Sequence, residues 1–223
     1  MSWERARTSE QKEARINEVM AAARRLLLKQ GFESVSLSQI ASELSFGRTN
    51  LYKYFESKEE IYLKLLSEEI AQFGRRLTKA REAAQSDEAD PVDNFVHLWT
   101  EHLKKEKAML LLMSLAGNIL EKNCSDRILL ESKTAMAAAS LQSFVPFVQS
   151  YFPHLSEEAA SDLLTSLIVT ANGLFPFCGL NNRQKQLLRK EGLGSLVHEF
   201  DESYKHMITG YLRGVKGDLP TQN

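Results

Sequence analysis

Hydrophobic residues recur at helical spacing along most of this chain. Leu37, Ile40, Ala41 and Leu44 stand at positions i, i+3, i+4 and i+7, so they share one face of a helix. Other segments repeat this spacing, and none shows the convincing alternation of apolar and polar residues that is typical of a half-buried strand. The pattern therefore predicts an all-α protein.

A long apolar stripe predicts the first helix, which begins near Thr8 or Ser9 and ends at Gly31. Ser36 and Gln39 have the spacing of a capping box, which predicts the start of a second, short helix. Ser45-Phe46-Gly47 then interrupts the pattern and predicts a turn. The apolar positions of the first helix are Ile16, Val19, Met20, Ala23, Leu26 and Leu27.

A third short helix follows the turn, with Leu51, Tyr54 and Phe55 on its apolar side, before a second capping box at residues 57–60. Two short helices joined by a tight turn form the unit that holds one helix against the major groove of DNA. Arg and Asn side chains bind guanine and adenine edges, and Thr contacts the thymine methyl group. The outward side chains of the third helix are Arg48, Thr49, Asn50, Tyr52 and Lys53.

These motifs resemble the DNA-binding domain of the TetR family of bacterial transcriptional regulators. The resemblance covers about residues 10–65 and is carried by Ile40-Ala41, by the turn, and by Leu51-Tyr52-x-Tyr54-Phe55-x-Ser57-Lys58-Glu59. Ser45 departs from the family pattern, which usually has Gly there, and a left-handed backbone at Ser45 would cost roughly 1 kcal/mol. Gly47 stands where the family often has a capping Ser, which costs only a few tenths of a kcal/mol.

The resemblance implies a three-helix helix-turn-helix domain over residues 1–56 and a larger helical regulatory and dimerisation domain over 57–223. It also implies a homodimer on a palindromic operator of double-stranded DNA, usually a repressor. Arg48, Thr49 and Asn50 are expected to contact bases, while Tyr54 and Lys58 bind phosphates and Tyr52 and Lys53 do either. Ser36 and Ser38 complete the expected DNA-binding residues.

Beyond residue 58 the apolar stripes predict further helices. They cover about residues 57–81, 91–103, 108–120, 125–152 with a bend at Pro146, 156–175 and 196–215. Residues 82–90 are a polar break, and residues 179–195 are expected to form a loop, with or without a short helix. The helices at about 156–177 and 196–215 are more apolar than one packed face requires. They are either core or, as the resemblance implies, the dimer interface.

The middle helices are the expected place for a small apolar or amphiphilic effector, since family members commonly bind one there. Apolar walls with a few polar groups are typical of ligand pockets, although the same residues at helical spacing are more often core. Asn172 is the most suggestive of them, because a buried amide requires partners. The candidates are Trp99, His102, Leu103, Met109, Met113, Phe144, Phe147, Asn172 and Phe175.

Charge supports DNA binding only when it is divided along the chain. The net charge is −1, but residues 1–58 hold 10 Lys and Arg against 7 Asp and Glu, and the remainder holds 18 against 22. The basic excess therefore falls on the helix-turn-helix segment. Because the excess is modest, affinity should depend on placed contacts more than on bulk charge.

The sequence offers little for other functions. No Gly-rich phosphate loop, HExxH or CxxC motif is present, so we expect no catalytic site, no metal site and no cofactor. The two cysteines, Cys124 and Cys178, are far apart and favour a reducing compartment; no apolar run reaches membrane-spanning length, and a cytoplasmic protein is expected. A helix-turn-helix in a sigma-like factor or recombinase, and an interaction module with a vestigial DNA-binding domain, are the alternatives.

Overall fold

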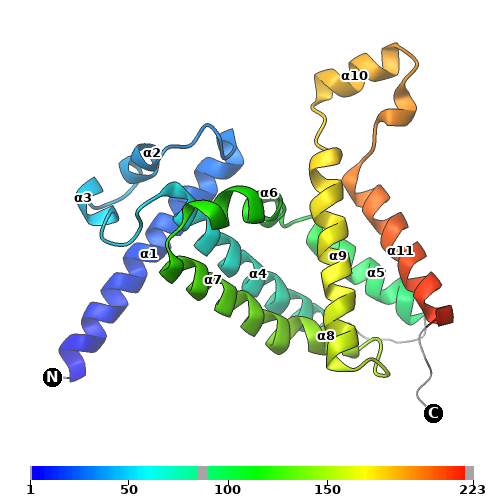
Figure 1. Cartoon of the computed structure of the whole chain (residues 1–223), viewed down its shortest axis with the longest axis horizontal. Coiled ribbons are helices and arrows are strands. Elements are labelled where there is room, and N and C mark those ends of the chain that lie inside the picture. Colours follow the sequence, from blue (N-terminus) through cyan, green and yellow to red (C-terminus); the bar gives the residue numbers. More distant parts are fainter. Residues whose placement is uncertain (1, 85–89, 219–223) are drawn as a thin grey trace. The chain divides into compact units, whose positions relative to one another are not determined.

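The computed structural model describes residues 2–84 and 90–218, and within them the chain forms helices and no strand (Figure 1). Two compact units are present. The first comprises the described residues up to Glu69 together with Leu115–Ala135, and the second comprises Ile70–Ser114 and the described residues from Met136 onward. The predicted all-α fold is confirmed. Most of the expected polar break at 82–90 lies outside the described residues.

The first unit is built around α1 and the start of α4. Its helices are α1 (Ser2–Gln30), α2 (Leu37–Ser42), α3 (Arg48–Leu51), the first part of α4 (Lys58–Ala83) and most of α7 (Asp126–Ala139), with a π-helical segment (Ala116–Leu120) and a 3-10 turn (Glu121–Asn123) before α7. Helix α1 begins at Ser2, so the predicted start near Thr8 or Ser9 was wrong. Its predicted end is confirmed: Gly31 has φ +77°, and its amide binds the Leu27 carbonyl at 2.9 Å.

The second unit contains the longer apolar helices. They are the second part of α4, α5 (Pro91–Leu103), α6 (Lys107–Leu115), α8 (Val145–Gln149), α9 (Glu157–Phe177), α10 (Asn182–Lys190) and α11 (Phe200–Asp218). Asp90 caps α5 by accepting from the Val92 amide at 2.7 Å, and Ser156 caps α9 by accepting from the Ala159 amide at 3.2 Å. Both predicted helix starts are therefore confirmed.

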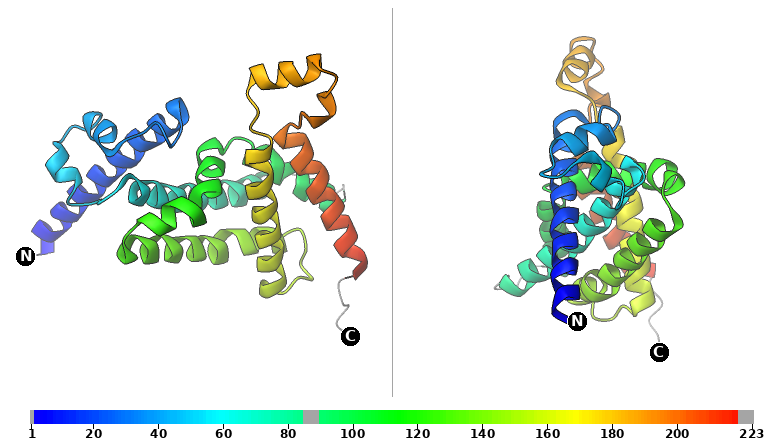
Figure 2. Two further views of the ribbon diagram at one scale, coloured as in Figure 1. Left: turned by 45° about the horizontal axis from the view of Figure 1, so that its top comes forward. Right: turned by 90° about the vertical axis from the view of Figure 1, so that its left-hand side faces the viewer.

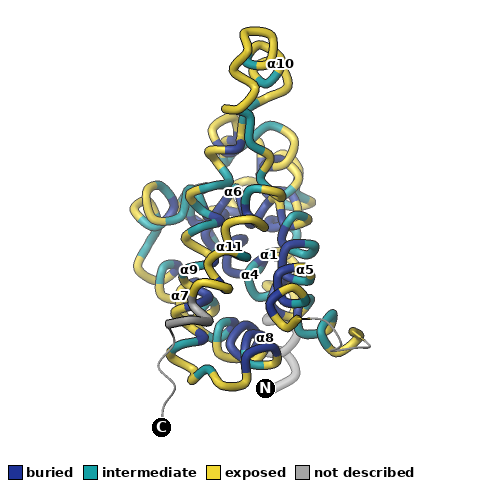
Figure 3. The backbone as a smooth tube through the Cα atoms, turned by 90° about the vertical axis from the view of Figure 1, so that its right-hand side faces the viewer, coloured by how far each residue is buried: buried dark blue, intermediate teal, exposed yellow. Residues whose placement is uncertain are grey.

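Three elements of this unit refine the sequence prediction. A π-helical segment (Ser140–Phe144) precedes Pro146, which cannot donate to the Gln142 carbonyl, so the expected irregularity lies before the proline. Residues 182–190 form α10, which Asn181 and Gln184 start with a capping box. Helix α11 begins at Phe200, after a 3-10 turn at Gly194–Leu196, and not near residue 196. Figure 3 shows that α10 is mostly exposed.

Aromatic side chains fill the core of the second unit. The Trp99 ring lies 5.4 Å from Phe73 and 5.8 Å from Phe95, and Phe95 lies 5.5 Å from Phe147. These rings are buried and meet in edge-to-face, stacked and tilted arrangements, which stabilise the core beyond the area that they bury. Helix α4 approaches this cluster closely at Gly74, where a Cβ would lie 2.8 Å from that of Ser143.

One polar link joins α5, α9 and α11, which pack together in this unit (Figure 2). The Tyr204 hydroxyl accepts from Trp99 Nε1 at 3.0 Å and donates to the Leu167 carbonyl at 3.0 Å. Tyr204 and Trp99 are 1% and 2% exposed, so water cannot replace either partner. Burial raises the pKa of Tyr204 well above its ordinary value, which keeps the hydroxyl protonated.

We expect Tyr204→Phe to lower the free energy of unfolding by about 1–3 kcal/mol, because it leaves the Trp99 N–H buried without a partner. Denaturant unfolding followed by circular dichroism measures the loss. Tyr52→Phe is the matched control, since Tyr52 is 44% exposed and its hydroxyl accepts from Arg48 Nη2 at 2.7 Å near solvent. Equal effects of the two variants would contradict this account.

Candidate nucleic-acid interface

The turn of the helix-turn-helix unit is fixed by α1. The amide and hydroxyl of Ser45 both donate to the Glu18 carboxylate, the hydroxyl at 2.8 Å. These bonds hold the pKa of Glu18 below its ordinary value, with the backbone amide of Ser45 as the largest cause. No described residue other than glycine has a positive φ, so Ser45 completes the turn without left-handed backbone. The hydrogen bonds to Glu18 hold the turn in place of a glycine.

Helix α2 begins with the predicted capping box. The Ser36 hydroxyl accepts from the Gln39 amide at 3.2 Å, and the Gln39 side chain accepts from the Ser36 amide at 2.8 Å. Ile40 and Ala41 are the buried residues of α2, while Ser36 and Ser38 are exposed. These two serines remain predicted DNA contacts, and Ser36 also fixes the start of the helix.

Helix α3 is short and depends on its neighbours. Gly47 is the N-cap residue of α3 and has no side chain that could accept a capping hydrogen bond. Leu51 and Phe55 are 0% and 1% exposed and anchor the helix to the unit. A helix of one turn is unstable by itself, so this burial is what holds it. The side chains that the sequence predicted to contact bases, Arg48, Thr49 and Asn50, are exposed or half-buried.

Arg48 and Tyr52 form a pair on the surface of α3. Arg48 Nη2 donates to the Tyr52 hydroxyl at 2.7 Å, and the guanidinium lies 5.4 Å from the centre of the ring. The pair limits the conformations of Arg48 without burying it. Lys53 is exposed beside it, and Tyr54 is half-buried with its ring 6.4 Å from that of Phe46.

The ammonium of Lys58, a predicted phosphate contact, is already bonded to main-chain carbonyls within the unit. Its Nζ donates to the carbonyls of Phe32 at 3.0 Å and Val35 at 2.9 Å, and it lies 4.2 Å from the centre of the Phe32 ring. This side chain therefore ties the start of α4 to the segment between α1 and α2. A phosphate contact by Lys58 stays a prediction.

A basic cavity of about 320 Å³ lies within the first unit, beside the exit of α3. Its cationic lining side chains come from α1, α4 and α7 as well as from Lys53. The sequence analysis missed them because they are spread along more than a hundred residues, from Lys12 to Arg127, and the only available signal was their positive charge. The added cationic residues are Lys12, Lys64 and Arg127.

Most of the predicted effector-pocket residues are packed as core. His102 is partly exposed, and burial together with nearby Lys105 lowers its pKa below the ordinary value. The Asn172 side-chain oxygen is buried and has no hydrogen-bond partner. The buried candidates are Trp99, Leu103, Met109, Met113, Phe144 and Phe147.

A cavity of about 590 Å³ lies in the second unit at the end of α9 and the start of α11. Phe175 is the one predicted pocket residue that lines it. The Phe175 and Phe200 rings meet at 5.2 Å, and carboxylates of Glu199, Asp201 and Glu202 also line the cavity. The only sequence signal for these carboxylates is the place of Asp201 and Glu202 in the first turn of α11, with Glu199 just before it, where acidic residues favour a helix start.

Family models match nearly the whole described chain. The model described as "Bacterial regulatory proteins, tetR family" matches residues 19–65, and the model described as "Tetracyclin repressor-like, C-terminal domain" matches residues 67–218. The first covers α2, α3 and the start of α4. The second covers the long apolar helices.

Known proteins with similar sequence or fold agree with these matches. The HTH-type transcriptional regulator YfiR of Bacillus subtilis, itself uncharacterized, is 31% identical over 75 residues, which are 34% of this chain and 37% of that protein. A TetR-family regulator from Syntrophomonas wolfei has a similar fold with 14% identity and a TM-score of 0.54, over 95% of this chain and 100% of that one. The fatty acid degradation regulator FadR from Bacillus halodurans has 14% identity and a TM-score of 0.50, over 82% and 94%.

Among the described residues, no single helix is long and apolar enough to cross a membrane. Helices α9 and α10 reach that length and hydropathy only as a pair, and the chain bends by 72° between them.

We expect Lys58→Met to lower the free energy of unfolding by about 1–3 kcal/mol, because the Phe32 and Val35 carbonyls lose a charged donor. Met keeps an apolar stem against the Phe32 ring. The control Lys53→Met removes the same charge from an exposed position and should change stability by less than about 0.5 kcal/mol. Thermal and denaturant unfolding of both variants decide the matter: an unchanged Lys58→Met protein would show that the two carbonyl contacts contribute nothing.

Proposed function

Because the chain belongs to the TetR family of bacterial transcriptional regulators, we propose that it binds a short, roughly palindromic operator as a homodimer and represses transcription until a small effector releases it. The observation that carries this proposal is α3 together with the turn that follows it, where buried Leu51 and Phe55 leave Arg48, Thr49 and Tyr52 exposed to solvent. A rigid anchor beneath polar, base-reading side chains is what recognition in the major groove requires.

The proposed DNA contacts follow the chemistry of each side chain. Arg48 and Asn50 bind base edges through paired hydrogen bonds, and Thr49 contacts a base or a thymine methyl. Tyr52 and Lys53 extend the contact to bases or phosphates. Tyr54, Lys58, Ser36 and Ser38 bind the phosphate backbone, Lys58 from the first turn of α4, where helix amides also attract phosphate.

The proposed dimer interface is the outer face of α9 and α11. This face exposes apolar side chains that a lone chain would leave in water, among them Val169 at 63% and Met207 at 50% exposed. A twofold dimer would place two α3 helices on half-sites about one DNA turn, roughly 34 Å, apart.

The proposed effector is a small apolar or amphiphilic molecule bound in the helical domain, which we place at residues 57–223, with the DNA-binding domain at 1–56. The 590 Å³ cavity beside Phe175 and Phe200 has a size typical of ligand sites. Binding would release DNA only if the effector prefers a dimer whose half-site spacing does not fit the operator. The protein would act in the cytoplasm, where its operator is.

Selection of bound fragments from a random double-stranded DNA library, with purified protein at moderate salt, tests this function. We expect enrichment of a palindromic motif, whose half-site spacing reports the dimer geometry. Protein that has been denatured, stripped of small molecules and refolded should be selected in parallel, because a carried-over effector would suppress enrichment. No enrichment from the refolded, helical protein would contradict the proposal.

On the selected operator, Arg48→Ala should weaken binding by about 1–3 kcal/mol and relax the preference at one base pair of each half-site. Arg75→Ala is the control, since Arg75 is exposed on the part of α4 that belongs to the second unit. Equilibrium binding to the operator and to single-base variants measures both effects. Uniform weakening across all sequences would instead identify Arg48 as a phosphate contact.

Val169→Glu should weaken the dimer by at least ~100-fold, because an unpaired carboxylate would be buried in the interface. Leu130→Glu is the control: Leu130 is 70% exposed on α7, outside the proposed interface. Sedimentation over a range of concentrations gives the dissociation constants, and a Val169→Glu protein that dimerises like the parent would exclude this face of α9.

A further inference from the structure

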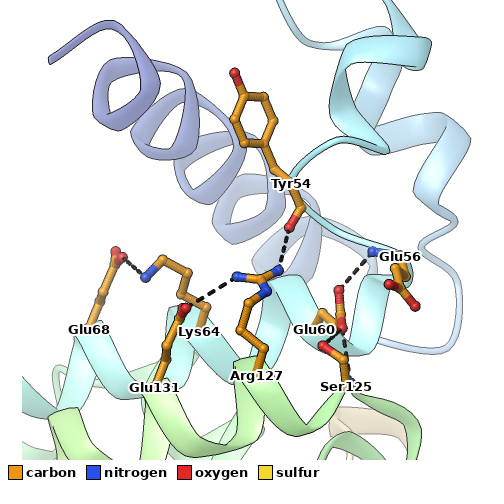
Figure 4. A network of polar contacts seen from close by, with 8 residues as sticks. All are labelled: Tyr54, Glu56, Glu60, Lys64, Glu68, Ser125, Arg127 and Glu131. Carbon is orange, nitrogen blue, oxygen red and sulfur yellow. Dashed lines mark hydrogen bonds and ion pairs between the residues drawn. The ribbon is translucent and has the colours of Figure 1, made fainter. Parts of the chain in front are cut away.

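The first unit includes a segment that lies far from the helix-turn-helix in sequence. Leu115–Ala135 groups with the residues up to Glu69, and its centre is the junction between the 3-10 turn Glu121–Asn123 and α7. Figure 4 shows this junction beside the residues that connect α3 to α4. We refer to the contacts among Tyr54, Glu56, Glu60, Ser125 and Arg127 as the exit clamp.

A buried carboxylate forms one half of the exit clamp. Glu60 lies in the first turn of α4 and is 1% exposed. Its Oε2 accepts from the Glu56 amide at 2.7 Å, and its Oε1 accepts from the Ser125 amide at 2.9 Å and from the Ser125 hydroxyl. Burial alone would raise the pKa of Glu60, but these hydrogen bonds outweigh it and hold the pKa below its ordinary value. The carboxylate is therefore ionised at neutral pH.

A guanidinium forms the other half. Arg127 Nη2 donates to the Tyr54 carbonyl at 3.2 Å, while Nη1 binds Glu131 at 3.2 Å on the same helix (Figure 4). Tyr54 and Glu56 flank Phe55, the buried residue that ends the α3 region. The exit clamp thus holds the main chain on both sides of this anchor, at one carbonyl and one amide.

A third bond strengthens the junction: the Ser57 hydroxyl donates to the Asn123 carbonyl at 3.0 Å and accepts from the Glu60 amide at 3.2 Å. The cap of α4 is therefore also a contact to the 3-10 turn. Each end of the α3–α4 connection is bonded to residues 123–127.

We propose that Glu60, Ser125 and Arg127 are positioning residues for DNA reading, which fix the direction of α3 through the main chain on either side of Phe55. Ser125 and Arg127 lie outside the helix-turn-helix and touch no base in this role. The inference rests on the proposed DNA-binding function, because the effect of α3 direction is discrimination between DNA sequences. Without the exit clamp, α3 can change direction while Leu51 and Phe55 stay buried. The exposed charges that attract DNA of any sequence are then still present.

The first measurement needs no DNA. Hydrogen exchange of the amides at residues 52–56 should speed up about 5- to 30-fold in full-length Arg127→Gln and Ser125→Ala, because local opening becomes easier by one or two kcal/mol. Lys122→Gln is the matched control, with the same loss of charge at an exposed residue of the same segment. Ser125→Thr keeps the hydroxyl and should restore protection. Unchanged exchange at 52–56 in both clamp variants would overturn the proposal.

The second measurement separates positioning from direct contact. We expect Arg127→Gln and Ser125→Ala to bind the selected operator about tenfold more weakly than the parent protein does at the same salt, because a misplaced base contact has roughly that effect. Binding to random DNA and the salt slope should match those of the parent. If Arg127→Gln weakens both DNAs equally and lowers the salt slope by about 1, Arg127 binds a phosphate itself and the positioning role is wrong. If the parent protein selects no operator, the proposed function fails, while hydrogen exchange still decides the exit clamp.

Discussion

The buried carboxylate of Glu60 is the constraint around which the first unit of this protein is arranged. A carboxylate removed from water is destabilising unless donors surround it, and here the donors come from residue 56 on one side and residue 125 on the other. The chain can satisfy Glu60 only by bringing the exit of α3 and the start of α7 to the same point. Because its pKa is lowered, Glu60 contributes stability above its unfolded-state pKa, and that contribution is lost as the pH falls through its folded-state pKa.

The two units are stabilised in different ways. In the second unit, aromatic rings around Trp99 fill the core, and the Tyr204 hydroxyl supplies its central polar link. In the first unit, apolar anchors such as Leu51 and Phe55 are supplemented by charged groups bonded to the main chain: Glu18 at the turn, Lys58 at the α1–α2 connection and Glu60 at the exit of α3. A one-turn helix buries too little surface to fix its own direction, so these polar contacts supply the orientation that packing alone does not.

Local chemistry in the sequence was enough to predict most helix ends. The capping box at Ser36, the helix end at Gly31 and the helix start at Pro91 act within a few residues, and each is confirmed. The burial of Leu51 and Phe55 followed from periodicity. The capping box at Asn181, which starts α10, is equally local, and of the two alternatives left open for residues 179–195 the structure has the one with a short helix. The early start of α1 carries no comparable capping signal.

The contacts that define the site were not predictable, because their partners are distant in sequence. Lys58 meets carbonyls 26 and 23 residues before it, Glu60 meets Ser125 65 residues after it, and Arg127 meets a carbonyl 73 residues before it. The sequence predicted that Lys58 contacts a DNA phosphate, and it indicated Glu60 only as part of the capping box at residues 57–60. The spacing of apolar residues does not predict which charged side chain will form hydrogen bonds with a distant main-chain group.

The exit clamp also differs from the apolar anchors in how it can be lost. Removing Phe55 from its site would expose a large apolar surface, whereas the hydrogen bonds of the exit clamp, each with a charged partner, contribute roughly 1.5–3 kcal/mol and can be lost singly. The segment that supplies them is reached through a π-helical stretch (Ala116–Leu120) and a 3-10 turn, geometries that hold their hydrogen bonds less well than an α-helix. The direction of α3 therefore depends on hydrogen bonds from this less regular segment, while its attachment depends on the burial of Leu51 and Phe55.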